Sequence, residues 1–284
     1  MSKLKPFYED VQAHYDLSDD FYRLFLDPTL TYRCAYFERD DMTLEEAQLA
    51  KVDLSLGKCE LQPGMRLLDV GCGWGTTAMR ATEKYGARVV GLTLSKNQHA
   101  TASTRVAGRD DIEFRLQGWE EFNEPVDRIV SIGALEHFRV ERFAAFFARC
   151  REVLPADGKM MIHSIVHGDS STIEPGQPDW DEDFLLYTRF MRREIFPNGQ
   201  VPARGMVQMH GEAAGFKLTK TQSLRLHYAR TLQCWSENLA REKDRAIEIT
   251  SQEIYDKYQF YLLRSSHYFR TGHIDVVQFS FAAK

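Results

Sequence analysis

A glycine-rich turn between two periodic segments constrains the fold of this chain most strongly. The stretch LLDVGCGWG at positions 67–75 follows an apolar run at 65–70 that is typical of a buried strand, and a helical pattern then continues to about Tyr85. Glycines permit a tight turn and let the backbone approach a ligand closely. A turn of this kind after a buried strand indicates an α/β sheet that binds a nucleotide-like ligand.

Strand and helix patterns alternate along the chain after this turn. Further strand-like runs lie at 88–92, 112–116, 127–132, 159–166, 216–224 and 276–281, and helical stretches lie at 98–106 and 143–154. Successive parallel strands need crossover connections. We therefore predict an α/β fold with a seven-stranded, parallel, doubly wound, Rossmann-like sheet. Before it, Thr43 and Glu46 form a capping-box pattern that opens a helix ending near Leu56.

We expect one domain over residues 1–284. Its parts are an N-terminal helical cover at 1–42, a cofactor-binding core at 43–166, an inserted helical substrate-binding region at 167–212, and C-terminal strands and helices at 213–284. The chain has 34 aromatic residues, and 17 of them lie in 1–37 and 255–281. This placement predicts an apolar cavity walled by the segments outside the sheet core.

Composition excludes several classes of protein. The net charge of −5 predicts no general attraction to nucleic acid. The sequence contains no run of about 18 apolar residues, so we expect no membrane span. The N-terminus lacks an apolar secretory stretch, so we expect a cytoplasmic protein. The five cysteines are scattered and never in CxxC spacing, which supports neither a metal site nor a disulfide framework.

The residues around the glycine turn favour S-adenosylmethionine as the ligand. Asp69 precedes Gly71, where a carboxylate can meet the ammonium group of this methyl donor, and the glycines form GxGxG rather than the dinucleotide pattern GxGxxG. A dinucleotide site and a purely structural turn are the alternatives. The second strand ends without the usual acidic residue for ribose, which leaves Gln98 and the backbone of Thr93 and Leu94.

The segment after the third strand offers groups for the adenine. Trp119 provides a ring for the adenine face and Glu120 a carboxylate for its amino group. Core packing is the alternative role for Trp119.

Several longer motifs then point to one family. They are YRCAYFERDDMTLEEAQ at 32–48, the glycine turn, GWEEF at 118–122, DRIVSIGALEHF at 127–138 and HYARTL at 227–232. In this order the chain resembles the mycolic acid cyclopropane synthases, a branch of the cyclopropane fatty acid synthases, over nearly its whole length. The resemblance implies a class I methyltransferase fold and methyl transfer from S-adenosylmethionine to a cis double bond in a very long acyl chain.

This chemistry places demands on the site. Attack of an alkene on the sulfonium methyl leaves a carbocation, so the pocket must exclude water, and aromatic faces can stabilise the developing charge. A base must then remove a proton so that the ring closes. The resemblance implies that this base is a bound bicarbonate, held by Glu136, His163 and Tyr228 and by backbone groups of Cys34 and Ile132.

The resemblance also implies the contacts of the methyl donor and its partners. We expect the donor to touch Tyr32, Arg33 (mostly through its main chain), Asp69, Gly71, Cys72, Gly73, Trp74, Gly75, Thr93, Leu94, Ser95, Gln98, Trp119 and Glu120. Tyr15 is a weaker candidate, and we interpret His137 as structural. The acyl substrate is expected on an acyl carrier protein, with at most transient membrane contact.

Two segments depart from the family pattern. Many relatives carry a cysteine where this chain has Ser265, so a mechanism with a thiolate there is in doubt. Within the insert, Trp180, Phe184, Tyr187, Phe190 and Met191 predict an amphipathic helix that either packs in the core or lines the acyl channel.

Two other functions compete with cyclopropane formation. Water could capture the cation, which would give a hydroxylated methyl branch, or the chain could be a non-catalytic lipid carrier.

Overall fold

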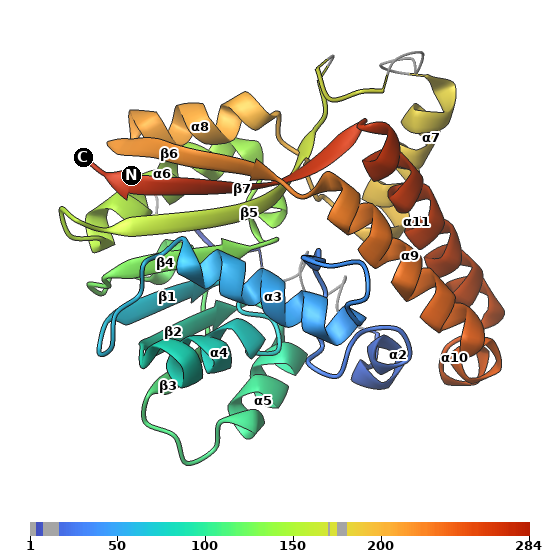
Figure 1. Ribbon diagram of the computed structural model, residues 1–284, viewed down its shortest axis with the longest axis horizontal. Coiled ribbons are helices and arrows are strands. Elements are labelled where there is room, and N and C mark those ends of the chain that lie inside the picture. Colours follow the sequence, from blue (N-terminus) through green and yellow to red (C-terminus); the bar gives the residue numbers. More distant parts are fainter. Residues whose placement is uncertain (1–3, 8–16, 170, 175–180) are drawn as a thin grey trace.

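A seven-stranded sheet forms the centre of the molecule. The computed structural model describes residues 4–7, 17–169, 171–174 and 181–284, and its strands follow the order β3-β2-β1-β4-β5-β7-β6 (Figure 1). They are β1 Arg66–Val70, β2 Arg88–Thr93, β3 Ile112–Leu116, β4 Arg128–Ile132, β5 Lys159–His167, β6 Phe216–Ser223 and β7 Ile274–Ala283. Each lies where the sequence predicted a strand, which confirms the Rossmann-like fold class.

The direction of β7 differs from the prediction of a wholly parallel sheet. Strands β1 to β5 are parallel, whereas β7 is antiparallel to both β5 and β6. Helix α11 (Gln252–Thr271) lies beyond the carboxyl ends of the parallel strands (Figure 1). The chain turns directly from α11 into β7 through Gly272, whose φ is +87°. The last strand therefore enters the sheet from that end and runs in the opposite direction.

Helices cover both faces of the sheet. On one face lie α3 (Leu44–Gly57), α4 (Thr76–Tyr85) and α5 (Lys96–Arg105), and on the other lie α6 (Phe143–Val153) and α8 (Arg204–Ala213). The capping box at the start of α3 is confirmed, since Thr43 and Glu46 exchange side-chain to backbone hydrogen bonds. Helix α6 lies in the helical stretch predicted at 143–154, and its aromatic side chains are buried against the sheet.

A separate helical layer lies beyond the carboxyl ends of the strands (Figure 1). Its elements are α2 (Asp19–Arg23), α7 (Glu182–Phe190) with a π-helical turn (Met191–Ile195), α9 (Arg225–Arg241), α10 (Lys243–Ile249) and α11. The largest aromatic cluster among the described residues is built mainly from these helices, with Trp235 fully buried between Phe25, Tyr32 and Tyr228. The aromatic residues outside the sheet core are thus concentrated in this helical layer, beyond the carboxyl ends of the strands. No helix in the described parts of the chain is long and apolar enough to cross a membrane.

The inserted region contains the predicted amphipathic helix. Asp181 caps α7, and Phe184 and Tyr187 form its buried side. Phe184 packs against Tyr268 and His273. Trp180 and Tyr15 lie outside the described residues.

Candidate active site

The glycine turn follows β1 at the edge of the sheet where the parallel strands end. Gly71, Gly73 and Gly75 have φ values of +82°, +56° and +89°, a left-handed backbone that residues with a Cβ rarely adopt. A Cβ on Gly71 would collide with Ala134, and one on Gly75 would collide with the ring of Phe114. At Gly73 the space is open. The turn therefore needs glycine both for its conformation and for close packing.

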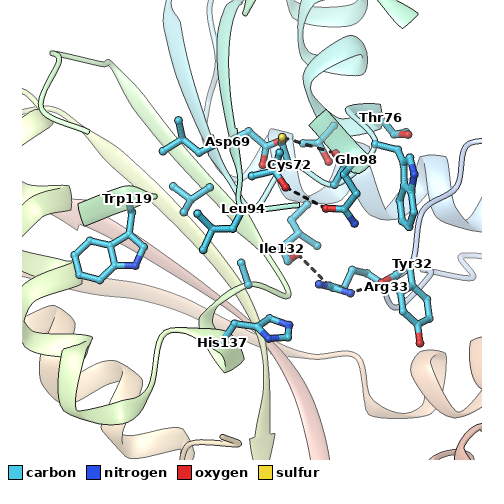
Figure 2. A pocket seen from close by; sticks show the side chains of 18 of the residues that line it. Tyr32, Arg33, Asp69, Cys72, Thr76, Leu94, Gln98, Trp119, Ile132 and His137 are labelled. Atoms are coloured by element: carbon cyan, nitrogen blue, oxygen red, sulfur yellow. Dashed lines mark hydrogen bonds between the residues drawn. The ribbon is translucent and has the colours of Figure 1, made fainter. Parts of the chain in front are cut away.

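A cavity with about 1000 Å³ of empty space, part of it open to solvent, surrounds this turn. We call it the glycine-loop cavity (Figure 2). Most of the residues predicted to bind the methyl donor line it, namely Tyr32, Arg33, Asp69, Gly71, Cys72, Gly73, Trp74, Thr93, Leu94, Gln98, Trp119 and Glu120. Gly75 and Ser95 do not. Gly75 precedes the first residue of α4, and the Ser95 side chain caps α5 by accepting from the backbone N–H of Gln98.

Two buried charged groups face the glycine-loop cavity. Asp69 is 1% exposed, and its Oδ2 accepts no hydrogen bond from any residue that the structure describes. Burial raises the pKa of this carboxyl to about 7, and the opposing charge of Lys51 limits the rise. Lys51 is also 1% exposed, and burial lowers its pKa to about 8. Its ammonium makes no hydrogen bond or ion pair with any residue that the structure describes.

Sequence reasoning missed Lys51, although a signal was present. Gln48, Lys51, Val52 and Ser55 share the buried face of α3 at helical spacing. A lysine on an otherwise buried face is costly unless a charge or ligand meets it.

Trp119 and Glu120 lie together on a 3-10 turn (Trp119–Glu121) at one end of the cavity. The indole packs against Phe138 and Phe146 and also lines the cavity. It can therefore serve in core packing and in ligand contact, the two roles predicted for it. Glu120 Oε1 accepts from Arg142 at 3.0 Å, while its buried Oε2 has no partner in the described part of the chain. Burial raises the pKa of Glu120.

A second cavity of about 1610 Å³, again partly open, lies between the sheet edge and the helical layer. We call it the helix-side cavity. Glu136, His163 and Tyr228 line it together with Tyr187, Met191, Leu232, Tyr261, Ser265 and Phe269. These residues come from the turn after β4, from β5, and from α7, α9 and α11. The structure thus brings the three predicted catalytic side chains to one cavity.

Two buried atoms in this cavity have no hydrogen-bond partner among the residues that the structure describes. Glu136 Oε1 accepts from the backbone N–H of Ile165 at 2.7 Å, but Oε2 accepts no hydrogen bond. Nε2 of His163 likewise has none. Burial raises the pKa of Glu136 and lowers that of His163 well below its usual range. Burial therefore shifts both groups toward their neutral forms.

Cys34 and Ile132 have different positions. Cys34 is fully buried and lines neither cavity. Its thiol lies 3.1 Å from the carbonyl oxygen of Ala35, and burial raises its pKa well above the usual value, so it is a packed thiol rather than a thiolate. Ile132 lines the glycine-loop cavity, where its carbonyl oxygen accepts from Arg33 Nε at 3.3 Å.

Arg33 and His137 are the two described residues that line both cavities. The Arg33 guanidinium also donates to the carbonyl oxygens of Tyr32, at 2.6 Å, and of Gly133. Figure 2 shows its side chain directed toward Ile132, with His137 on the same side of the cavity. The side chain of Arg33, and not only its main chain, therefore lies at the boundary between the two cavities. His137 was predicted to be structural, yet it too lies at the boundary of the two cavities.

Ser265 lies in the wall of the helix-side cavity. It is 2% exposed, and its hydroxyl is 2.8 Å from that of Tyr187. A serine cannot supply the thiolate considered for this segment. Among the described residues, no group of three or more His, Cys, Asp or Glu side chains could hold a metal ion.

The sheet order, the glycine turn after β1 and the cavity around it define the class I methyltransferase fold. Coclaurine N-methyltransferase, a structure with bound S-adenosylhomocysteine (SAH), shares this fold with a TM-score of 0.78 at only 22% identity.

Similarity to a narrower group covers almost the whole chain. Residues 2–279 match the family described as mycolic acid cyclopropane synthetase. Cyclopropane mycolic acid synthase 1 of Mycobacterium tuberculosis is 54% identical over 98% of both chains. The structure of the cyclopropane synthase MmaA2 from the same organism has a TM-score of 0.96, with 54% identity over 99% of this chain and 100% of that one. CmaA1, solved with SAH and CTAB, has a TM-score of 0.94 at 55% identity over 99% and 100% of the two chains.

The chain belongs to the mycolic acid cyclopropane synthetase family. It is an S-adenosylmethionine-dependent methyltransferase of that family, as the resemblance of its motifs predicted.

Proposed function

We propose that this enzyme forms a cyclopropane ring on a cis double bond of a very long, unsaturated, meromycolic-type acyl chain. The observation that carries the proposal is the pair of unpartnered buried atoms, Glu136 Oε2 and His163 Nε2, in a cavity that adjoins the glycine-loop cavity. The relative CmaA1 was solved with SAH and with CTAB, a molecule with a long alkyl chain and a cationic head. Two adjoining cavities suit a donor and an acyl chain of this kind.

The glycine-loop cavity is the place for S-adenosylmethionine. In this proposal Asp69 receives the ammonium group of the donor, and Trp119 and Glu120 receive its adenine. Gln98 and the backbone of Thr93 and Leu94 take the ribose. The Thr93 hydroxyl donates to Gln98 Oε1 at 3.1 Å, which leaves the amide NH₂ of Gln98 available to a ligand.

The helix-side cavity is the place for the alkene and for bicarbonate. When bound, bicarbonate would supply the base that removes a proton from the newly transferred methyl group. Glu136, His163 and Tyr228 fit such an anion because neutral carboxyl, imidazole and phenol groups can each donate a hydrogen bond to it. A buried carboxylate would repel the anion, so the raised pKa of Glu136 serves this arrangement.

The surrounding residues have a second task, which is to keep water from the carbocation. Tyr228, Tyr261 and Phe269 line the helix-side cavity and present aromatic rings there. Such faces stabilise a developing positive charge and exclude the water that would capture it. Delivery of the acyl chain by an acyl carrier protein remains a proposal drawn from the family resemblance.

Isotope labelling tests the product. The protein would be incubated with an alkene-containing acyl substrate and a donor whose methyl group carries three deuterons. Cyclopropane formation retains two of the three deuterons, and the product shows high-field cyclopropyl protons. A hydroxylated methyl branch would retain all three, and a lipid carrier would transfer none; either result would contradict the proposal.

A further inference from the structure

Polar side chains at paired positions of neighbouring strands form a row that begins at His163. The register places His163 on β5 opposite Gln278 on β7, and Gln278 opposite Gln222 on β6. Lys58, which follows α3, reaches both glutamines. Its ammonium donates to Gln222 Oε1 at 2.7 Å and to Gln278 Oε1. None of these residues except His163 lines either cavity.

The contact with Lys58 determines the orientation of the Gln278 amide. An ammonium group has only donors, so the atom of Gln278 that faces it must be the carbonyl oxygen. The amide nitrogen Nε2 then faces the other way, 3.0 Å from Ser55 Oγ and 3.3 Å from His163 Nδ1. Ser55 donates its own proton to the carbonyl oxygen of Lys51 at 2.8 Å and is therefore free to accept from Gln278.

The amide orientation determines the tautomer of His163. Because Gln278 Nε2 is a donor, Nδ1 of the imidazole must accept, and a neutral imidazole then carries its single proton on Nε2. The ring is buried, and burial together with the positive charges of Lys51, Arg33 and Lys58 lowers its pKa well below the usual range. These cations and burial both oppose a second proton on the ring.

We propose that Lys58 and Gln278 are positioning residues that hold His163 as the Nε2–H tautomer, so that His163 donates a hydrogen bond into the helix-side cavity. The ligand atom opposite Nε2 is then an acceptor, as an oxyanion is. His163 in this state cannot take a proton from the substrate. This inference rests on the proposed function for the identity of the ligand, but the tautomer itself does not.

Nitrogen NMR of ¹⁵N-histidine-labelled protein tests the tautomer without any ligand. The His163 signals are assigned with a His163→Gln variant, and long-range ¹H–¹⁵N correlations show which nitrogen carries the proton. We expect Nε2–H in the wild-type protein. In Gln278→Glu a carboxylate faces Nδ1 and accepts from it, so the ratio of the two tautomers should change by about tenfold or more toward Nδ1–H.

Gln222→Glu is the matched control. It changes the other amide that Lys58 contacts, on the neighbouring strand, without touching the imidazole. Its tautomer should stay Nε2–H. Lys58→Met should reduce the share of Nε2–H because the amide of Gln278 can then rotate, and Lys58→Arg should restore it.

Three results would overturn the inference. They are a wild-type His163 with its proton on Nδ1, a Gln278→Glu variant that binds SAH normally with an unchanged tautomer, and a Lys58→Met variant with full Nε2–H. If Gln278→Glu does not fold, the wild-type spectrum and the Lys58 variants still decide.

Titration with ¹³C-bicarbonate separates this inference from the proposed function. Wild-type protein that shows Nε2–H but binds no bicarbonate would contradict the bicarbonate proposal and support the positioning role. Bicarbonate binding that is weaker by about tenfold in Gln278→Glu, with SAH affinity within about twofold of wild type, would support both.

Discussion

Glu136 has a buried carboxyl oxygen, Oε2, that accepts no hydrogen bond from any residue that the structure describes. Replacement by glutamine keeps the size of the side chain but removes the O–H that a neutral carboxyl offers to an anion. We expect Glu136→Gln to bind SAH within about twofold of wild type and to lose about 100-fold or more in turnover. Calorimetry and product analysis measure the two effects.

The neighbouring Glu141 provides the control for this variant, because it is exposed and lies in the next 3-10 turn (Val140–Arg142). Glu141→Gln should keep full activity. Normal turnover in Glu136→Gln would remove Glu136 from the mechanism.

Lys51 is a buried cation that a ligand of the glycine-loop cavity can reach. The donor's amino-acid end carries an ammonium, which suits Asp69, and a carboxylate, which suits Lys51. We expect Lys51→Met to weaken SAH binding by about tenfold or more, because a charge-assisted hydrogen bond is lost. Methylthioadenosine lacks the amino-acid end, so its affinity should be unchanged. An equal loss for both ligands would indicate a structural role for Lys51 instead.

The same two groups predict a pH dependence for donor binding. Asp69, with a pKa of about 7, must lose its proton to receive the ammonium, so SAH affinity should rise as the pH increases through 7. Lys51, with a pKa of about 8, loses its charge above that pH, so affinity should then fall. Calorimetry across this range should give a maximum between the two values. Methylthioadenosine should bind with no such maximum.

At the scale of elements, α3 packs on one face of the sheet and carries polar side chains that reach the site. It carries Lys51 on its buried face, Ser55 one turn further on, and Lys58 directly after its end. The capping box of Thr43 and Glu46 holds its first turn. Loss of this cap therefore affects an element that lines the glycine-loop cavity through Lys51 and contacts Gln278 through Ser55.

Thr43→Ala should lower the free energy of unfolding by about 1 kcal/mol, the usual effect of removing an N-cap side chain. Denaturant unfolding measures the change. Thr104→Ala, at an exposed position of α5, is the control and should stay within about 0.5 kcal/mol of wild type. Equal stability of Thr43→Ala and wild type would show that the cap contributes nothing in this context.

At the scale of the whole molecule, two cavities share a boundary made of Arg33 and His137. The glycine-loop cavity depends on the parallel part of the sheet. The helix-side cavity also needs the helical layer, whose aromatic cluster is distinct from the two sheet-face clusters. Binding at the two sites should therefore be separable by substitution.

Val201→Phe should fill part of the helix-side cavity, which Val201 lines from a loop. We expect weaker binding of a long-chain quaternary ammonium probe such as CTAB, with SAH affinity unchanged. Lys51→Met should have the reverse pattern. Parallel losses of both ligands in either variant would contradict two separable sites.

Much of the fold was predictable because its signals are local. Strand and helix periodicity, the glycine turn and the capping box each depend on residues close together in sequence. The direction of β7 was not predictable, since an apolar strand pattern reads the same in both directions and only the position of α11 decides it.

The site was predictable only in part. Asp69 lies near the end of β1 and Glu136 follows β4, where ligands bind in such sheets. His163 lies within β5, level with Ile132 at the end of β4. The family resemblance pointed to these residues as well. For Lys51 the sequence carried only the helical spacing of the buried face of α3, and the side chain of Arg33 and the row from Lys58 to His163 had no such signal. Their roles depend on contacts between residues far apart in the chain.

The sequence by itself determined the sheet, the glycine turn and the segments that hold the surplus aromatic residues, because periodicity and backbone preference act over a few residues. Only the tertiary structure decided which of the described charges are buried without partners, where the two cavities meet and which nitrogen of His163 faces Gln278. Burial and hydrogen-bond direction depend on every group around a side chain, and those groups come together only when the chain has folded.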